Sequence, residues 1–261
     1  MPGQIAVERD NAVATVLIDN TAKLNALTVA MWQELARVMR ELSADDALRC
    51  VVIRGAGDKA FAAGADIAEF ATVRNTRKQG VIYHRKHVYG ALQAVAECRH
   101  PVVAMIHGPC VGGGLELACQ CDLRISGASG RFGVPINRLG FSIAYDELAA
   151  VLPVVGRAAA LEILLEGRVL DAQEACAKGL LTRVVPDAEL ANEVSATVAR
   201  IASGAPLVAR WHKQFVRRLT PRAEPLTAQE IDDSFAYFDS EDFREGYAAY
   251  LQKRKPGFKG R

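Results

Sequence analysis

The sequence predicts an α/β fold followed by a helical C-terminal region. Short apolar strands alternate with helical segments along most of the chain, which is typical of α/β architecture. Two glycine-containing loops, at residues 55–65 and 108–114, each follow a buried strand and precede a helix. Beyond about Arg157 strand patterns nearly vanish. The successive helices there predict a region packed against the core or against a neighbouring subunit.

The N-terminal part begins with a predicted β-hairpin. Residues 5–19 alternate apolar and polar side chains on either side of a turn at Asp10. Apolar residues at helical spacing then predict a helix over residues 27–46, and a buried strand follows at residues 49–55. After the first glycine loop, residues 79–98 again have helical spacing.

The strand, glycine turn and helix then recur. The second unit comprises a strand at residues 101–108, a helix at 114–120 and a strand at 122–127. Helical patterns dominate the remainder, with one short strand at residues 180–186. The predicted helices there cover residues 158–167, 171–179, 188–204 and 206–219, and a last one in 240–261 ends in a basic extension. We place the boundary between a core (1–195) and a helical region with a basic tail (196–261).

Composition excludes several classes of protein. The formal net charge of the 261-residue chain is +2, which gives no general reason to expect nucleic acid or an anionic membrane as a partner. The N-terminus lacks a basic segment followed by an apolar run, and the apolar stretches look far shorter than the roughly 20 residues that span a bilayer. The six cysteines show no C-x-x-C spacing. We therefore expect a cytoplasmic protein with free thiols and no metal.

The stretch "HGPCVGGGLELACQCD", residues 107–122, places a glycine-rich turn before an apolar helix that carries Glu116. It is not a P-loop, because neither lysine nor a hydroxyl residue follows the glycines. Unpaired N–H groups at a helix N-terminus suit a developing oxyanion, and Ala65 opens a helix after the other glycine loop in the same way. The glycines alone fit two simple tight turns equally well.

Several motifs together resemble the crotonase (enoyl-CoA hydratase/isomerase) superfamily, in order and over nearly the whole chain. They are "AKLNALT", "AFAAGADIAEF", "IHGPCVGGGLELACQCDLRI", "FGVPINRLG" and the tail "SEDFREGYAAYLQKRKPGFKG". The resemblance implies a ββα-superhelical core with a C-terminal helical trimerisation region, assembled as a homotrimer or dimer of trimers. It also implies an acyl-CoA thioester as substrate, with no cofactor apart from the CoA that is part of the substrate.

The resemblance implies catalytic and binding roles for the residues at the positions that match the family's motifs. The N–H groups of Ala65 and Gly113 would form the oxyanion hole, and Glu116 matches one of the two glutamates of the hydratases. A structural alternative for Glu116 is complementing the helix dipole. The tail residues could equally be a solvated end. The remaining positions that would contact CoA or the acyl group are Lys23, Leu24, Ala26, Ala63, Asp66, Ile67, Gly112, Pro135, Ile136, Lys255, Phe258 and Lys259.

The chain departs from the hydratase pattern at Ile136, where hydratases carry their second glutamate after the proline. An isoleucine cannot orient water or donate a proton. We therefore expect Glu116 to act as the single acid/base, as in a Δ3,Δ2-enoyl-CoA isomerase. The alternatives are decarboxylation of a malonyl-type thioester, or hydration with a substitute second acid. Candidates for that acid are Asn137, Tyr145, Asp146 and Glu147.

Three further hypotheses concern other residues. His84 and His87 belong to the helix that often bounds the acyl pocket in this family, although a surface or core position is the commoner explanation for each. A thiol hydrolase built on His107 and Cys110 is chemically distinct, but it would need an orienting third group. A catalytically silent CoA-binding member is the alternative outside enzymology, and retention of Glu116 argues against it.

Overall fold

The computed structural model describes residues 2–220 and 225–261. Its main sheet has six strands in the order β1-β2-β3-β4-β6-β9, and a smaller sheet has the order β5-β7-β8. The first two strands form the predicted antiparallel hairpin, and the others join the main sheet in parallel. The strands are β1 (Gln4–Asp10), β2 (Val13–Asp19), β3 (Cys50–Gly55), β4 (Val102–Ile106), β5 (Pro109–Val111), β6 (Leu123–Gly127), β7 (Arg131–Gly133), β8 (Leu170–Asp171) and β9 (Arg183–Val185).

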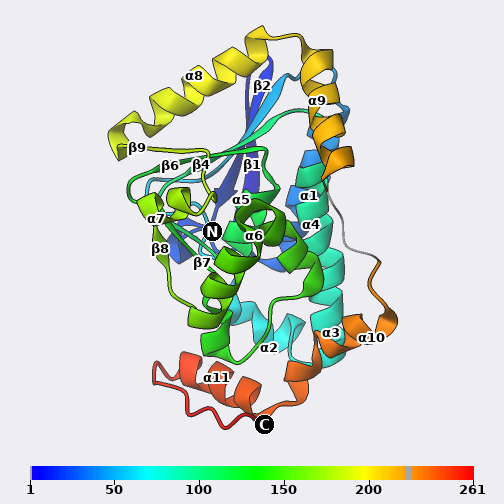
Figure 1. Ribbon diagram of the computed structural model, residues 1–261, viewed down its shortest axis with the longest axis vertical. Coiled ribbons are helices and arrows are strands. Elements are labelled where there is room, and N and C mark those ends of the chain that lie inside the picture. Colours follow the sequence, from blue (N-terminus) through cyan, green and yellow to red (C-terminus); the bar gives the residue numbers. More distant parts are fainter. Residues whose placement is uncertain (1, 221–224) are drawn as a thin grey trace.

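Helices follow most strands, and a run of them ends the chain (Figure 1). The α-helices are α1 (Val29–Ala44), α2 (Phe70–Val73), α3 (Arg77–Ile82), α4 (Tyr89–Glu97), α5 (Gly113–Gln120), α6 (Tyr145–Glu166), α7 (Ala172–Ala177), α8 (Leu190–Ser203), α9 (Pro206–Leu219), α10 (Ala228–Asp233) and α11 (Glu241–Leu251). Short 3₁₀-helices are η1 (Thr21–Lys23), η2 (Ile67–Glu69), η4 (Pro135–Leu139), η5 (Asp187–Glu189) and η6 (Ala236–Asp239). The element η3 (Tyr83–Val88) is a π-helix.

Both faces of the main sheet are covered. Successive side chains of a strand point to opposite faces, so Val51 and Ile53 of β3 join the large core with α1 and α4, whereas Cys50 and Val52 join a second cluster. Helix α8 covers that second cluster with Leu190, Val194 and Val198. This two-sided burial accounts for the nearly continuous apolar run of β3, and it confirms the predicted α/β fold.

The C-terminal helices occupy two ends of the molecule. Helices α8 and α9 lie at one end, and α10 and α11 lie at the other, beside α2 and α3 (Figure 1). The packing of α11 against η4 is close, because a Cβ on Gly246 would lie 2.5 Å from the carbonyl carbon of Leu139. The division of the chain at residues 195/196 stays a prediction, and this boundary lies inside α8.

Several local features differ from the sequence-based expectation. The predicted helix over residues 158–167 is the end of the longer helix α6, which begins at Tyr145. The predicted helix over residues 79–98 is divided by the π-helix η3, whose wider turn changes the phase of the side chains. The expectation that all apolar stretches are far too short for a bilayer is wrong for α6, a 22-residue helix that contains an 18-residue window with a mean hydropathy of 2.0. That helix is bent in the middle, because Gly156 has a φ of +72°.

Candidate active site

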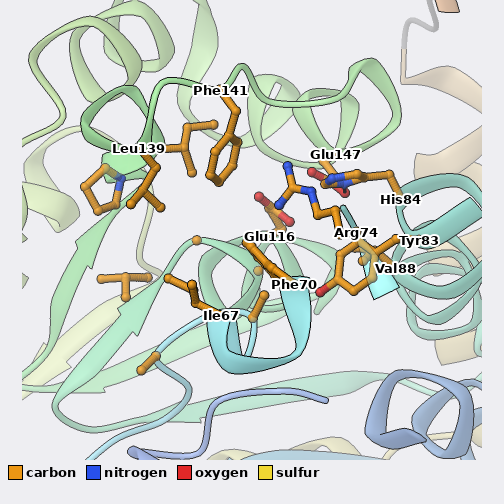
Figure 2. A pocket seen from close by; sticks show the side chains of 18 of the residues that line it. Ile67, Phe70, Arg74, Tyr83, His84, Val88, Glu116, Leu139, Phe141 and Glu147 are labelled. Atoms are coloured by element: carbon orange, nitrogen blue, oxygen red, sulfur yellow. Dashed lines mark hydrogen bonds and ion pairs between the residues drawn. The ribbon is translucent and has the colours of Figure 1, made fainter. Parts of the chain in front are cut away.

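A pocket of about 670 Å³ opens between the two glycine loops, η3, η4 and the start of α6. Its walls are mainly apolar, and four basic or acidic side chains project into it: Arg74, His84, Glu116 and Glu147 (Figure 2). The other lining residues are Trp32, Ala63, Gly64, Ala65, Ile67, Phe70, Tyr83, Val88, Val111, Gly112, Gly113, Pro135, Ile136, Leu139 and Phe141.

Backbone hydrogen bonds hold the two glycine loops side by side. The N–H of Ala62 donates to the carbonyl of Pro109 (3.1 Å), and the N–H of Val111 donates to the carbonyl of Ala62 (3.1 Å). The approach at Gly114 requires glycine, because a Cβ there would lie 2.3 Å from the Ala62 carbonyl oxygen. Residues 55–65 and 108–114 therefore form one continuous wall, although they are far apart in the sequence.

Ala65 and Gly113 both line the pocket. Within residues 2–220 and 225–261, the backbone N–H of neither residue donates a hydrogen bond to a protein acceptor. Gly113 is the first residue of α5, where the helix dipole is positive. The two donors are thus free to bind an oxygen atom of a ligand, in the manner of an oxyanion hole.

Glu116 lies in the first turns of α5, on the same wall as these donors. It is only 5% exposed, and its Oε2 would lie 3.8 Å from a Cβ placed on Gly113. Burial raises the pKa of Glu116 well above its usual range, and the nearby Glu147 carboxyl adds to the effect. A carboxyl group with a raised pKa holds a proton more strongly, which suits a general acid or base in a closed cleft.

Ile136 lines the pocket beside Pro135 in η4. It packs against the large hydrophobic core and offers no polar atom beyond its backbone. Leu139 and Phe141 extend this apolar wall (Figure 2). Chemistry that needs a second carboxyl must therefore find it elsewhere in the pocket.

A second carboxyl does reach the pocket, from the start of α6. Glu147 is 4% exposed, and its Oε1 shares a short hydrogen bond with Nδ1 of His84, which is also buried. Burial raises the pKa of Glu147 to about 8, against the opposing effect of Arg74. Burial also lowers the pKa of His84 well below its usual range, and Arg74 adds to this. His84 comes from the π-helix η3, so the pair joins segments 63 residues apart.

The structure distinguishes among the candidates for a substitute acid. The amide of Asn137 donates to the carbonyl of Leu165 (3.0 Å), and Asp146 accepts from Arg85 (3.1 Å). Tyr145 is 42% exposed. Among these candidates, all of which the structure describes, Glu147 is the one that lines the pocket.

Sequence reasoning missed Arg74, which is 3% exposed and lines the pocket. Its Nη2 donates to the hydroxyl of Tyr237 (2.6 Å). Its guanidinium lies 4.2 Å from the ring centroid of Phe141 and 4.6 Å from that of Phe70. The run "RNTRKQ" is typical of a solvated surface, so the only signal was the arginine's position just after the apolar "FATV" of α2.

The other predicted contact residues divide into two groups. Ala63, Ile67, Gly112, Pro135 and Ile136 line the pocket. Lys23, Leu24, Ala26 and Asp66 lie on a neighbouring loop pair, where Lys23 Nζ lies 2.6 Å from Asp66 Oδ2 and the N–H of Ala63 donates to the carbonyl of Leu24 (3.0 Å).

The basic tail lies against the start of α11. The carbonyl of Arg261 accepts from the N–H of Glu241 (2.7 Å), and the N–H of Lys259 donates to Asp242 (2.6 Å). Lys255, Phe258 and Lys259 are exposed and contribute nothing to the pocket lining of the described chain.

The thiol hypothesis finds no support in this geometry. Cys110 is fully buried, its Sγ contacts the carbonyl of Gly114 (3.5 Å), and burial raises the pKa of the thiol well above its usual range. Neither Cys110 nor His107 lines the pocket in the described part of the chain. His87, the other histidine considered, bonds to Gln33 (3.1 Å) outside the pocket. All six cysteines are unpaired, and five are buried.

Comparison with known proteins relates this site to a family. A model of the family described as "Enoyl-CoA hydratase/isomerase" matches residues 8–261. A short-chain-enoyl-CoA hydratase of Clostridium acetobutylicum is 31% identical over 98% of both chains. The crystal structure of an enoyl-CoA hydratase/carnithine racemase from Magnetospirillum magneticum is 50% identical, with a TM-score of 0.82 over 98% of this chain and 96% of that one.

A methylmalonyl-CoA decarboxylase in complex with 2-nitronate-propionyl-CoA is also similar, with 27% identity and a TM-score of 0.88 over 98% of both chains. The match to the family extends across both glycine loops, the pocket and the C-terminal helices. The chain belongs to the enoyl-CoA hydratase/isomerase family, within the crotonase superfamily.

Proposed function

We propose that this protein is an enzyme that converts an acyl-CoA thioester through an enolate, with Glu116 as the acid/base. The observation that carries the proposal is the arrangement of Glu116 on the same wall as two N–H groups that no described acceptor uses. A thioester oxygen placed between Ala65 and Gly113 would accept both hydrogen bonds. The carbon next to the thioester would then lie near the Glu116 carboxyl.

The two donors would act on the charge that develops during proton removal. An α-proton of a thioester leaves only when the negative charge on the oxygen is stabilised, and one such donor is worth about 3 kcal/mol in enzymes that use them. The N-terminus of α5 adds a positive dipole at the same point. The apolar walls keep water away and strengthen both effects.

With Glu116 as the single acid/base, the reaction is isomerisation of a 3-enoyl to a 2-enoyl thioester. The carboxylate takes a proton from the α carbon and, as the acid, returns it to the γ carbon. The apolar Ile136 wall supports this reaction, because it provides no group that would hold an attacking water molecule.

Hydration is a second candidate, and the position of Glu147 favours it. A pKa of about 8 keeps Glu147 protonated near neutral pH, and His84 fixes the orientation of its carboxyl group. In this reaction one carboxyl would orient the water and the other would supply the α-proton. The naming of a 31% identical relative as a hydratase agrees with this candidate.

The CoA portion and the assembly belong to the same proposal. The loop pair that holds Lys23, Leu24, Ala26 and Asp66 would contact CoA, and Lys255, Phe258 or Lys259 would add contacts from the tail. Helix α9 exposes an apolar stripe at four-residue spacing, which supports self-association through this face. We propose a homotrimer or a dimer of trimers, located in the cytoplasm. This stripe comprises Leu207, Trp211, Phe215 and Leu219, which are 49–79% exposed.

A substrate panel tests the proposal. Crotonyl-, 3-enoyl- and methylmalonyl-CoA are incubated with the wild type and with Glu116→Gln, and hydration, isomerisation and decarboxylation are followed by mass spectrometry. We expect isomerisation that depends on Glu116. Rapid hydration of crotonyl-CoA would instead support the second candidate.

Other outcomes of the same panel contradict the proposal. Loss of CO₂ from methylmalonyl-CoA as the main reaction would indicate a decarboxylase. CoA binding without turnover of any thioester would indicate a silent binding protein. Unchanged turnover by Glu116→Gln would exclude Glu116 as the acid/base.

A further inference from the structure

Arg74 carries a buried positive charge that no carboxylate in the described part of the chain neutralises by direct contact. Within residues 2–220 and 225–261, no carboxylate oxygen lies within 4.0 Å of its side-chain nitrogens. Of its five N–H donors, one is used by the hydroxyl of Tyr237. Its Nε is buried and has no hydrogen-bond partner among the described residues. A buried cation in this state is costly unless a ligand pairs with it.

Aromatic rings compensate part of this cost. Phe70 and Phe141 lie within 5 Å of the guanidinium carbon, at 4.6 and 4.2 Å to their ring centroids. Such contacts are worth about 0.5–2 kcal/mol each. Burying an unpaired charge costs several kcal/mol, so the rings offset only part of it. The rings hold the side chain in place at the edge of the cavity, but they provide no hydrogen-bond acceptor for the donors that Tyr237 leaves free.

The other ionisable groups of the pocket leave an excess of positive charge. Glu147 and His84 share one hydrogen bond, and the pair is neutral whichever of the two holds the proton. Glu116 is buried beside Glu147, a setting that favours its protonated, neutral form. Arg74 opposes this effect, and Glu116 ionises when it acts as the base. Before that step, Arg74 is the group among these four that carries an unbalanced charge. A single negative charge on a ligand would restore neutrality.

We propose that the acyl group of the substrate ends in a carboxylate, which binds the free N–H donors of Arg74. The substrate is then the CoA monothioester of a dicarboxylic acid. This inference rests on the proposed function, and it specifies the substrate class of the same site.

The shape of the pocket agrees with such a ligand. Figure 2 shows the guanidinium of Arg74 between the Glu116 carboxyl and the Glu147–His84 pair, with Phe70 and Phe141 beside it. A thioester oxygen held by Ala65 and Gly113 places the start of the acyl chain beside Glu116. Its methylene groups would contact apolar side chains, and its far end would reach the guanidinium. A planar guanidinium binds a carboxylate through two parallel hydrogen bonds.

Binding of saturated thioesters tests the inference without requiring turnover. Succinyl-, glutaryl- and adipyl-CoA are compared by isothermal titration calorimetry with butyryl-, pentanoyl- and hexanoyl-CoA, their neutral counterparts of equal carbon number. We expect at least one dicarboxylic thioester to bind about tenfold to 100-fold more tightly than its neutral counterpart, as charged hydrogen bonds predict. If none of the three binds more tightly than its counterpart, the inference is wrong.

Variants assign the preference to Arg74. Arg74→Met should reduce the ratio of the two dissociation constants to about one, and Arg74→Lys should retain part of it. Arg77→Met is the matched control, since Arg77 pairs with Asp232 and Asp239 on the surface and should keep the full ratio. A ratio in Arg74→Met equal to that of the wild type would overturn the inference.

Two further measurements separate alternative explanations. If Arg74→Met does not fold, the same ratio of dissociation constants is measured for Tyr237→Phe. This variant frees one more N–H of Arg74 and should keep the preference for the dicarboxylic thioester. Loss of the preference in Tyr237→Phe would count against the inference. Glu116→Gln tests the proposed function on its own. Unchanged turnover by that variant would refute the enolate mechanism and leave the binding ratio as the test of Arg74.

Discussion

Replacement of Gly114 by alanine should separate the two glycine loops that form the proposed oxyanion hole. A Cβ at this position would lie 2.3 Å from the carbonyl oxygen of Ala62 and 2.9 Å from its Cβ. Ordinary contact begins near 3.4 Å, so the N-terminal turn of α5 must move by roughly 1 Å. That movement carries Gly113 away from Ala65, because Gly113 precedes the substituted residue on the same turn.

The expected loss of activity follows from this displacement. A misplacement of about 1 Å in a catalytic group costs on the order of 100-fold in rate, and loss of one oxyanion donor costs about 100-fold to 1000-fold. We therefore expect Gly114→Ala to lower kcat by at least about 100-fold. Turnover of the best thioester from the substrate panel measures this, and thermal unfolding reports whether the variant is folded.

Gly90→Ala is the matched control for this substitution. Gly90 lies in α4, and an added Cβ there meets no atom within 4 Å. Alanine is the better helix former by about 1 kcal/mol, so this variant should keep full activity and unfold no earlier than the wild type. A folded Gly114→Ala variant with kcat within threefold of the wild type would refute the reasoning.

Three other variants test separate parts of the account. Glu116→Gln should lower turnover by about 100-fold to 10,000-fold with little change in thermal stability, and a loss below tenfold would contradict the acid/base role. Because burial raises the pKa of Glu147 to about 8, this carboxyl holds a proton in the folded state that it has lost in the unfolded state between about pH 4.5 and 8, and its contribution to the free energy of unfolding falls as the pH rises through that window. Denaturant unfolding of Glu147→Gln should show a flatter slope with pH there, and a slope equal to that of the wild type would contradict the raised pKa. A Trp211→Glu, Phe215→Glu double variant should dissociate the proposed oligomer, which light scattering would detect as a smaller mass; an unchanged mass would exclude α9 as the interface.

Local patterns in the sequence predict much of the fold and half of the candidate site. The hairpin, the buried strands and the two glycine loops depend on residues that are close in the chain, so alternation and glycine placement predict them. Glu116 and Gly113 share one helix start, and Ala65 follows the other loop. Their place around the same pocket agrees with the parallel arrangement of β3 and β4, since both loops follow at the same edge of the sheet.

The other half of the site depends on contacts that no local pattern shows. Glu147 is one of four polar candidates for the second acid. Its place in the pocket depends on how the start of α6 packs against η3, where it bonds to His84. The π-helix η3 carries Tyr83, His84 and Val88 into the pocket together. Arg74 stands in a polar run, and its burial requires rings from α2 and from the segments around Phe141 and Tyr237.

The bend in α6 and the course of the C-terminal region are equally non-local. Gly156 adopts a left-handed conformation inside a stretch whose composition favours one continuous helix. Phe235 and Phe238 return to the pocket region from beyond α9 and pack beside the start of α6. Hydrophobic periodicity identifies the individual helices there, but their placement depends on tertiary packing.

Exchange of the α-protons of pentanoyl-CoA in D₂O tests the central claim most directly. This thioester has no double bond and no second carboxylate, so the measurement reports enolate formation alone. The account predicts that the wild type catalyses exchange, followed by NMR or mass spectrometry, and that Glu116→Gln slows it by at least about 100-fold. Exchange at the same rate in Glu116→Gln and the wild type, or no exchange by the wild type above the rate in buffer, would contradict it.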